Sequence, residues 1–305
     1  MEKGSRFLLA AAYAAISFIW GSTYLAIKVG LAGFDPIFFV GIRYALAALL
    51  LVPVMLLFRE RFTGTLASWG PVLVVGVMFI SVSNGLVFWG ETRLDSGYTA
   101  LLITASPVWT AALTPLLPGE PRLGGRGWLG IALGAVGTLV LIAPWRTGGF
   151  ELMGALAVEV SVVVWAVAAL WVRRLGDRYQ PVPFTIAQMV AGALPMLALA
   201  GVRGRAVVAP LTWQASVSLG YLIVVGSCVA FLAYFYLLRH WSATKVSSAA
   251  YLNPVVALAL GAAVLDEPVT ALMVVGTAVV LAGVALVLQE RRETVDGELG
   301  GRDAR

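Results

Sequence analysis

The chain has 305 residues, of which 60% are hydrophobic and only 12% are charged, and its formal net charge is +5. A soluble domain carries about twice that share of charge, so the composition argues against a soluble enzyme or a nucleic-acid-binding protein. The single cysteine, Cys228, lies in an apolar run and can form no internal disulfide.

Apolar stretches near the length of a membrane-spanning helix, about 20 residues, follow one another along the whole chain. The first contains Trp20 and Tyr24 and is longer than the core of a signal peptide, so we interpret it as an uncleaved helix. The ten predicted spans are 7–29, 36–58, 69–90, 97–117, 126–144, 151–172, 183–202, 214–237, 244–265 and 271–289.

The second half of the chain repeats the first. Trp20, Pro36 and Arg43 recur 145 positions later as Trp165, Pro181 and Gln188, and Pro107, Glu120 and Pro121 recur 147 positions later as Pro254, Glu267 and Pro268. Five spans per half would place the copies in opposite orientations around a central cavity. We therefore expect an all-α integral membrane protein with repeats at 7–144 and 151–289, followed by a polar, disordered cytoplasmic tail at 290–305.

Lys and Arg residues predict the orientation in the membrane. With the N-terminus in the cytoplasm, the inside segments hold 15 of the 21 basic residues, the outside segments hold 5, and Arg43 lies within a span. This three-to-one bias favours cytoplasmic N- and C-termini.

The fourth and ninth spans carry a central proline, in Ser106-Pro107 and Asn253-Pro254. Proline removes a backbone hydrogen bond and frees a carbonyl, which in a membrane needs a partner or a wet cavity. The matched prolines therefore point to the central site. The alternative is a packing kink with no ligand contact.

Other repeated residues have structural interpretations. Glu120 and Glu267 each precede a predicted helix, where a carboxylate can cap free N–H groups; proton coupling is the alternative. Gly130 and Gly134 in the fifth span form a small-xxx-small step that allows close helix packing. We assign the fifth and tenth spans to the scaffold.

Charged side chains within spans are candidate functional residues. Arg43 lies about 10 Å into the second span and could bind a carboxylate, pair with Glu159, or extend to the interface. Glu159 lies about 12 Å into the sixth span and could bind an ammonium group, carry a proton, or form a structural ion pair.

The sequence resembles the drug/metabolite transporter superfamily, in its ten-helix form with two EamA repeats. The resemblance rests on the segment from Trp20 to Lys28, on Pro36 with Arg43, and on the doubled proline and Glu-Pro motifs, and it covers about residues 7–289. It implies a basket of ten helices around a cavity, with the fifth and tenth peripheral, and export of amino acids, other small metabolites or toxic compounds. Because Gln188 stands at the position in the second repeat that corresponds to Arg43, the second repeat cannot share any role of Arg43.

We therefore predict a secondary transporter of the cell membrane that exports amino acids or related metabolites by alternating access. The alternatives are an exporter of toxic amphipathic compounds and a non-transporting membrane interaction protein. The only histidine, His240, has no metal-ligand cluster around it in sequence, so we expect no enzyme, metal or cofactor. The expected partners are a small-molecule substrate, the lipid bilayer and a coupling proton. Polar and aromatic stripes, matched motifs and embedded charges predict the substrate-binding residues Trp20, Tyr24, Arg43, Asn84, Phe88, Ser106, Glu159, Trp165, Tyr234, Tyr251 and Asn253.

Overall fold

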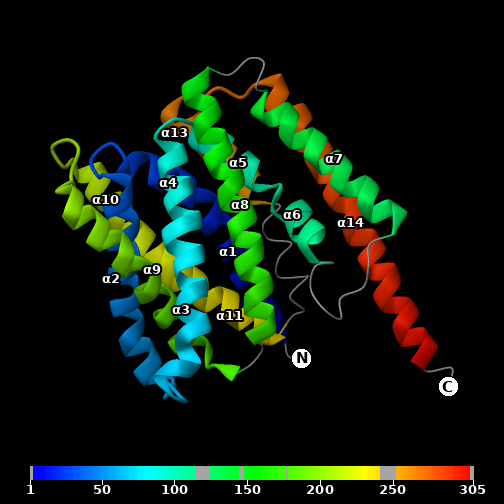
Figure 1. Ribbon diagram of the computed structural model, residues 1–305, viewed down its shortest axis with the longest axis horizontal. Helices are drawn as coiled ribbons and strands as arrows, with labels where there is room; N and C mark the ends of the chain where they lie inside the picture. The colour runs from blue at the N-terminus through cyan, green and yellow to red at the C-terminus, as the bar shows by residue number, and fades with distance from the viewer. Residues whose placement is uncertain (1–2, 115–123, 144–147, 176–177, 241–251, 303–305) are drawn as a thin grey trace.

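The computed structural model describes residues 3–114, 124–143, 148–175, 178–240 and 252–302, and these are almost entirely helical (Figure 1). The helices of the first half are α1 (Lys3–Gly30), α2 (Pro36–Leu57), η1 (Leu66–Trp69), α3 (Gly70–Gly76), η2 (Val77–Asn84), α4 (Gly85–Glu91), α5 (Ser96–Ile103), α6 (Ser106–Leu113) and α7 (Gly125–Ile142). Those of the second half are α8 (Gly149–Leu175), α9 (Pro181–Arg203), α10 (Trp213–Ile223), η5 (Val224–Val229), α11 (Ala230–His240), α13 (Asn253–Leu265) and α14 (Ala271–Arg302).

The two halves run in opposite directions, as the odd number of spans per repeat predicts. In Figure 1, α1 rises from the end of the molecule that bears the N-terminus, whereas its counterpart α8 descends toward that end. The counterparts α7 and α14 are likewise antiparallel, and both chain termini lie at the same end. The structure is therefore an all-α protein built from an inverted pair.

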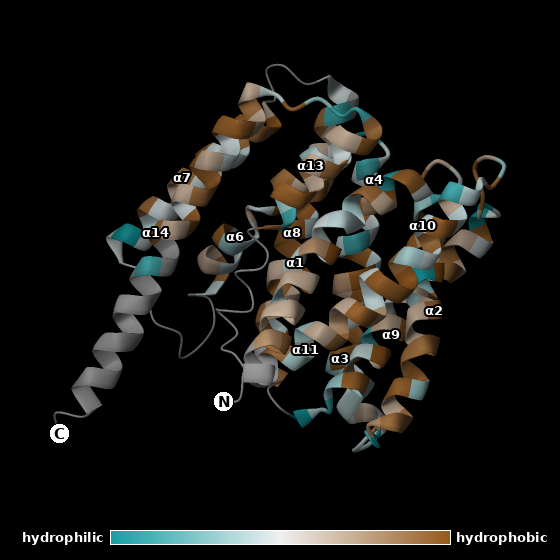
Figure 2. Ribbon diagram, turned by 180° about the vertical axis from the view of Figure 1, so that it is seen from behind, coloured by the Kyte–Doolittle hydropathy of each residue, from teal (hydrophilic) through white to brown (hydrophobic). Residues whose placement is uncertain are grey.

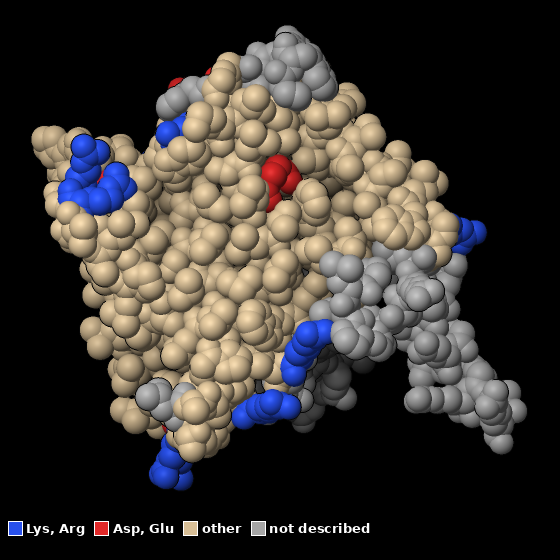
Figure 3. All heavy atoms as spheres, viewed as in Figure 1, with Lys and Arg blue, Asp and Glu red and all other residues tan. Residues whose placement is uncertain are grey.

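Seven of the described helical stretches are long and apolar enough to cross a membrane. The other three predicted spans occur as shorter apolar helices: α5 with α6, α13, and the Ala271–Leu286 part of α14. Hydrophobic residues predominate along the helices coloured in Figure 2, and the face drawn in Figure 3 has Lys and Arg side chains near its margins. This distribution suits a protein whose solvent is largely hydrocarbon.

Helix α2 begins where its sequence provides a cap. The Asp35 side chain accepts a hydrogen bond from the backbone N–H of Ile37 at 3.0 Å, and Pro36 occupies the first turn, where a missing N–H costs nothing. The Glu60 carboxylate beyond the other end of α2 accepts from the N–H of Val182 at the start of α9. A side chain that follows α2 thus caps the start of α9, the corresponding helix of the second repeat.

Glycines permit the close packing of α7 on α14, which lie side by side in Figures 1 and 2. A Cβ atom at Gly283 would lie 2.5 Å from the carbonyl oxygen of Gly130 and 2.6 Å from the backbone nitrogen of Gly134. Because neither contact is possible for a real side chain, the backbones can approach this closely only with glycine at 283.

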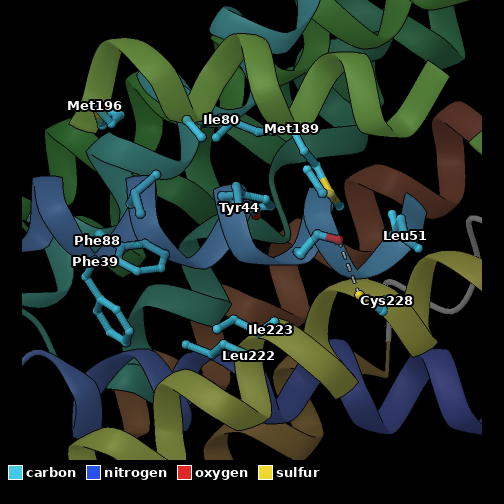
Figure 4. Close-up of a cluster of buried hydrophobic side chains, with 14 of the residues drawn as sticks. Phe39, Tyr44, Leu51, Ile80, Phe88, Met189, Met196, Leu222, Ile223 and Cys228 are labelled. Atoms are coloured by element: carbon cyan, nitrogen blue, oxygen red, sulfur yellow. Dashed lines mark hydrogen bonds between the residues drawn. The ribbon is translucent and has the colours of Figure 1, made fainter. Parts of the chain in front are cut away.

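The main hydrophobic core lies where α2 meets η2, α4, α9, α10 and η5, so both repeats contribute to it (Figure 4). Phe39 and Phe88 are fully buried there, and their rings meet edge-to-face with centroids 5.2 Å apart. The Cys228 thiol donates to the Ala47 carbonyl oxygen at 3.6 Å. The cysteine is therefore a small core residue in this fold.

Two helical segments adopt the wider π form at matched places. They are η2 in the third span and η5 in the eighth, and their first residues, Val77 and Val224, are separated by the 147-residue shift of the repeat. A π segment releases one backbone hydrogen bond from the regular α pattern and often occurs at functional sites. Both segments lie beside the polar groups described below.

Helix α14 continues to Arg302, into the polar segment that was expected to form a cytoplasmic tail. Extension of a helix that is already formed does not incur the cost of nucleation again. The Glu and Arg residues of this segment also have good helix propensity.

Candidate functional site

Arg43 is buried in the core between the two repeats. Its side chain is 4% exposed, and its Nε donates to the hydroxyl of Ser227 in η5 at 3.3 Å. Ser227 in turn donates to the carbonyl oxygen of Leu222, five residues earlier, at 2.9 Å. The π segment of the second repeat therefore positions the hydroxyl that holds Arg43 of the first.

Aromatic rings surround the guanidinium of Arg43. Its central carbon lies 4.7 Å from the ring centroid of Tyr44 and 5.9 Å from that of Phe88. Such rings stabilise a buried cation through their negative faces without neutralising it. Among the described residues no carboxylate forms an ion pair with Arg43, so its planar fork is available to an anionic group.

A hydrogen-bonded chain extends from this cation into η2. The Tyr44 hydroxyl donates to Oδ1 of Asn84 at 3.0 Å, and Nδ2 of Asn84 donates to the carbonyl oxygen of Phe79 at 2.8 Å. Asn84 thus satisfies a carbonyl within the π segment. Tyr24, the other predicted aromatic residue of the first span, lies on α1 and is half-buried.

Glu91, at the end of α4, is a second buried charge-bearing residue. It is 0% exposed, and neither carboxylate oxygen has a hydrogen-bond partner. Lys28 of α1 approaches the same turn, but its Nζ donates to the backbone carbonyl oxygens of Glu91 and Leu94, at 3.0 and 2.6 Å. The lysine thus joins two helix ends and leaves the carboxyl of Glu91 unpaired.

Glu159 does not pair with Arg43, which corrects one of the alternatives drawn from the sequence. It is 8% exposed, and its Oε2 accepts from the indole N–H of Trp109 in α6 at 3.1 Å, whereas Oε1 has no partner. The pairing failed because α6 packs on α8 and supplies a neutral donor to Glu159, while η5 supplies one to Arg43.

The sequence motif Ser106-Pro107 marks a break in the fourth span. Backbone bonds three residues apart replace the α-helical pattern at Thr104 and Ala105, and α6 then starts with Pro107 in its first turn. Pro254 occupies the same position at the start of α13, next to Asn253. The break directs α6 so that Trp109 reaches Glu159.

Glu267 caps a helix of the opposite repeat, and not the helix that follows it in sequence. Its carboxylate accepts from the backbone N–H groups of Ser96 and Gly97, at 2.8 and 2.9 Å, and from the Ser96 hydroxyl at 2.9 Å. These are the first residues of α5, whose own N-cap residue, Asp95, makes no side-chain cap. Its counterpart Glu120 lies outside the described part of the chain.

Asp95 is displaced from the capping role by Glu267. Burial raises the pKa of its carboxyl above the ordinary aspartate value, the nearby Glu267 raises it further, and Lys28 opposes both. The loop between α4 and α5 therefore concentrates acidic groups around a single lysine.

The remaining predicted binding residues lie in several different environments. Trp20 packs against the rings of Tyr234 and Phe231, with centroids 5.4 and 6.3 Å away. Phe88 is enclosed in the core, whereas Trp165 is 42% exposed and packs against Phe79. Ser106 and Asn253 start the helices after the chain breaks, and Tyr251 lies outside the described residues.

An apolar groove of about 670 Å³ lies between α3, η2 and α9, away from these charges. Leu73, Val77, Val190 and Leu194 are among its lining residues. Such a lining offers no polar group to orient a charged metabolite. The buried polar groups are therefore the better candidates for the transport site.

Ser227, Tyr44 and Lys28 were not among the predicted binding residues, although the structure joins each to the buried charges. Ser227 was visible as a polar residue within a span, but its partner is 184 positions away. Tyr44 follows Arg43 directly in the sequence, and this was the only feature of the sequence that could have marked it as a site residue.

Buried charges held between inverted repeats of apolar helices define a membrane transporter rather than an enzyme. The model of the EamA-like transporter family matches residues 7–143 and again residues 152–289. The chain belongs to this family, within the drug/metabolite transporter superfamily.

Similar proteins agree with this assignment. The chain is 29% identical over 277 residues to the Uncharacterized inner membrane transporter YedA of Escherichia coli K12, covering 90% of this chain and 88% of that protein. It is 26% identical over 291 residues to an Uncharacterized transporter of Synechocystis, with the same two coverages. A solved crystal structure with 18% identity superposes with a TM-score of 0.64, covering 93% of this chain and 98% of the other, which shows a shared fold.

Proposed function

We propose that this transporter is a secondary exporter of amino acids or related small metabolites, working by alternating access at the cell membrane. The observation that carries the proposal is Arg43, a buried arginine that Ser227 holds across the two repeats and that pairs with no carboxylate of the described residues. Arginine binds a carboxylate through two parallel hydrogen bonds, and a site between repeats can face either side of the membrane.

Glu159 supplies the complementary charge. Its Oε1 is buried and unpaired, and an ammonium group that approached it would recover the hydrogen bond that this oxygen lacks. The aromatic group of Trp20, Phe231 and Tyr234 provides apolar contact area for a side chain. It equally suits an amphipathic toxic compound, which is the second candidate substrate.

Charge and one relative support the proposed orientation and location. The three-to-one bias of Lys and Arg supports cytoplasmic termini. YedA is named as an inner membrane transporter, which supports the same location for this chain.

The purified protein in proteoliposomes tests the proposal. Radiolabelled phenylalanine should enter or leave protein-containing vesicles faster than empty ones, and Arg43→Gln, which recreates the residue of the second repeat, should abolish this flux. Arg205→Gln, at an exposed arginine, is the matched control and should leave it unchanged.

Two results would contradict the proposal. If an amphipathic cation moves and phenylalanine and other amino acids do not, the alternative substrate class is correct. If no compound moves under any ion gradient, the chain is a non-transporting membrane interaction protein. Glu159→Gln tests the proposed binding of the substrate ammonium group by Glu159. Undiminished flux of an amino acid in this variant would exclude that role.

A further inference from the structure

Glu91 has no assigned role, yet it is the acidic side chain most completely enclosed in the described structure. It is 0% exposed, and both carboxylate oxygens lack a donor. An ionised carboxylate in such a place costs several kcal/mol unless a cation or several hydrogen bonds compensate it. Neither is present among the described residues, so the enclosure of Glu91 favours the neutral carboxylic acid over the carboxylate.

The cations of α1 and α2, Lys28 and Arg43, do not pair with the Glu91 carboxyl in this conformation. Lys28 directs its ammonium to the backbone carbonyl oxygens of Glu91 and Leu94, and Arg43 is bonded to Ser227. Both cations nevertheless act on the Glu91 carboxyl through their fields, as does the negative charge of Glu267. A small rearrangement of the flexible Lys28 side chain would bring its ammonium to a carboxylate at Glu91.

The elements around α4 contribute the following ionisable groups, besides Asp95 in the loop after α4 and Glu267, whose carboxylate caps α5. Helix α1 provides Tyr24 and Lys28, and α2 provides Arg43 and Tyr44. At the contact with α8, Gly90 meets Val158 and Gly154, while the neighbouring Glu159 bonds to Trp109. Segment η2 offers Ser83 and Asn84, which do not titrate, and α5 offers Tyr98. Arg93, in the following loop, stacks on the Trp89 ring 3.5 Å away.

We propose that Glu91 is the proton-binding residue of the transport cycle, protonated in the conformation described here and paired with Lys28 after it releases the proton. This inference rests on the proposed function. On release, after the transport cycle has opened the site to water, the O–H bond of the carboxyl breaks, the proton passes to that water, and the electron pair stays on the carboxylate. The charge that appears is then met by the ammonium of Lys28, which leaves its two carbonyl partners.

Infrared spectroscopy of the purified full-length protein at neutral pH tests the protonation directly. The wild type should show the carbonyl band of a buried protonated carboxylic acid, and Glu91→Gln should lose that component. Glu151→Gln, at an exposed acid, should retain it, and Glu159→Gln should retain the part that belongs to Glu91. Identical spectra for wild type and Glu91→Gln would overturn the proposal. Glu91→Asp keeps a carboxyl and should show a shifted carbonyl band. It replaces Glu91→Gln in this test if the glutamine variant does not fold.

Transport measurements separate this proposal from the function on which it rests. With phenylalanine as the probe, a pH gradient should drive net flux in the wild type, and Glu91→Gln should lose this net flux while exchange of labelled for unlabelled phenylalanine persists. Net flux in Glu91→Gln that still follows the pH gradient would refute the role of Glu91 and leave the transporter intact. A protonated Glu91 band in a protein that moves no amino acid would instead refute the proposed substrate class.

Discussion

Replacing Glu267 by alanine should destabilise the protein by about 2–4 kcal/mol, because the change removes three hydrogen bonds worth about 1 kcal/mol each. The lost bonds run from Ser96 and Gly97 to the carboxylate, and they are the cap of α5. Ser96 is fully buried, so its N–H and hydroxyl cannot turn to water instead. Glu267→Gln retains one acceptor oxygen and should cost about half as much.

Thermal unfolding of the detergent-purified protein, followed by tryptophan fluorescence, measures this effect. The midpoint should fall in the order wild type, Glu267→Gln, Glu267→Ala. Asp266→Asn is the matched control. It removes a neighbouring negative charge, takes no part in the three cap hydrogen bonds, and keeps a residue that tolerates the left-handed backbone at φ 53°. If alanine at 267 lowered the midpoint no more than the control, the cap would not stabilise the contact between the repeats.

Three further substitutions have defined expectations. Ser227→Ala should weaken phenylalanine binding about fivefold in a thermal-shift titration, since it removes about 1 kcal/mol of positioning for Arg43; unchanged affinity would exclude this positioning. Gly283→Leu should destabilise the fold by about 1–3 kcal/mol through overpacking, whereas Gly220→Leu, with open space around it, should be neutral in the same melt. Because burial raises the folded-state pKa of Asp95, the native state binds its proton more tightly than the unfolded state, and stability declines as pH rises above about 4. Asp95→Asn should remove that decline in thermal melts recorded across pH, and an unaltered pH dependence would contradict the assignment.

The architecture was predictable because its signals are local or repeated. Apolar stretches of spanning length and a constant shift between Pro107 and Pro254 are visible in the sequence, and they correctly predicted an all-helical membrane protein with two repeats. The break at Pro107 also has a local cause, since proline lacks the N–H that a continuous helix would use.

The site was less predictable because its contacts join distant positions. The cap from Glu267 to Ser96 spans 171 residues, and periodicity gives no information on which helix end a loop acid will meet. The same holds for Arg43 and Ser227. The sequence indicated that a charge was embedded, but the identity of its partner depends on how the two repeats pack.

The contacts between corresponding helices, α2 with α9 and α7 with α14, limit what an unfused ancestor could have contained. Two identical chains meeting in this way would form a symmetric homodimer, in which every residue near the axis occurs twice. An arginine at position 43 would then be accompanied by a second buried arginine at the equivalent position, with like charges and no carboxylate to separate them. Joining the halves in one polypeptide removes that constraint, so that arginine can stand at 43 while glutamine stands at 188.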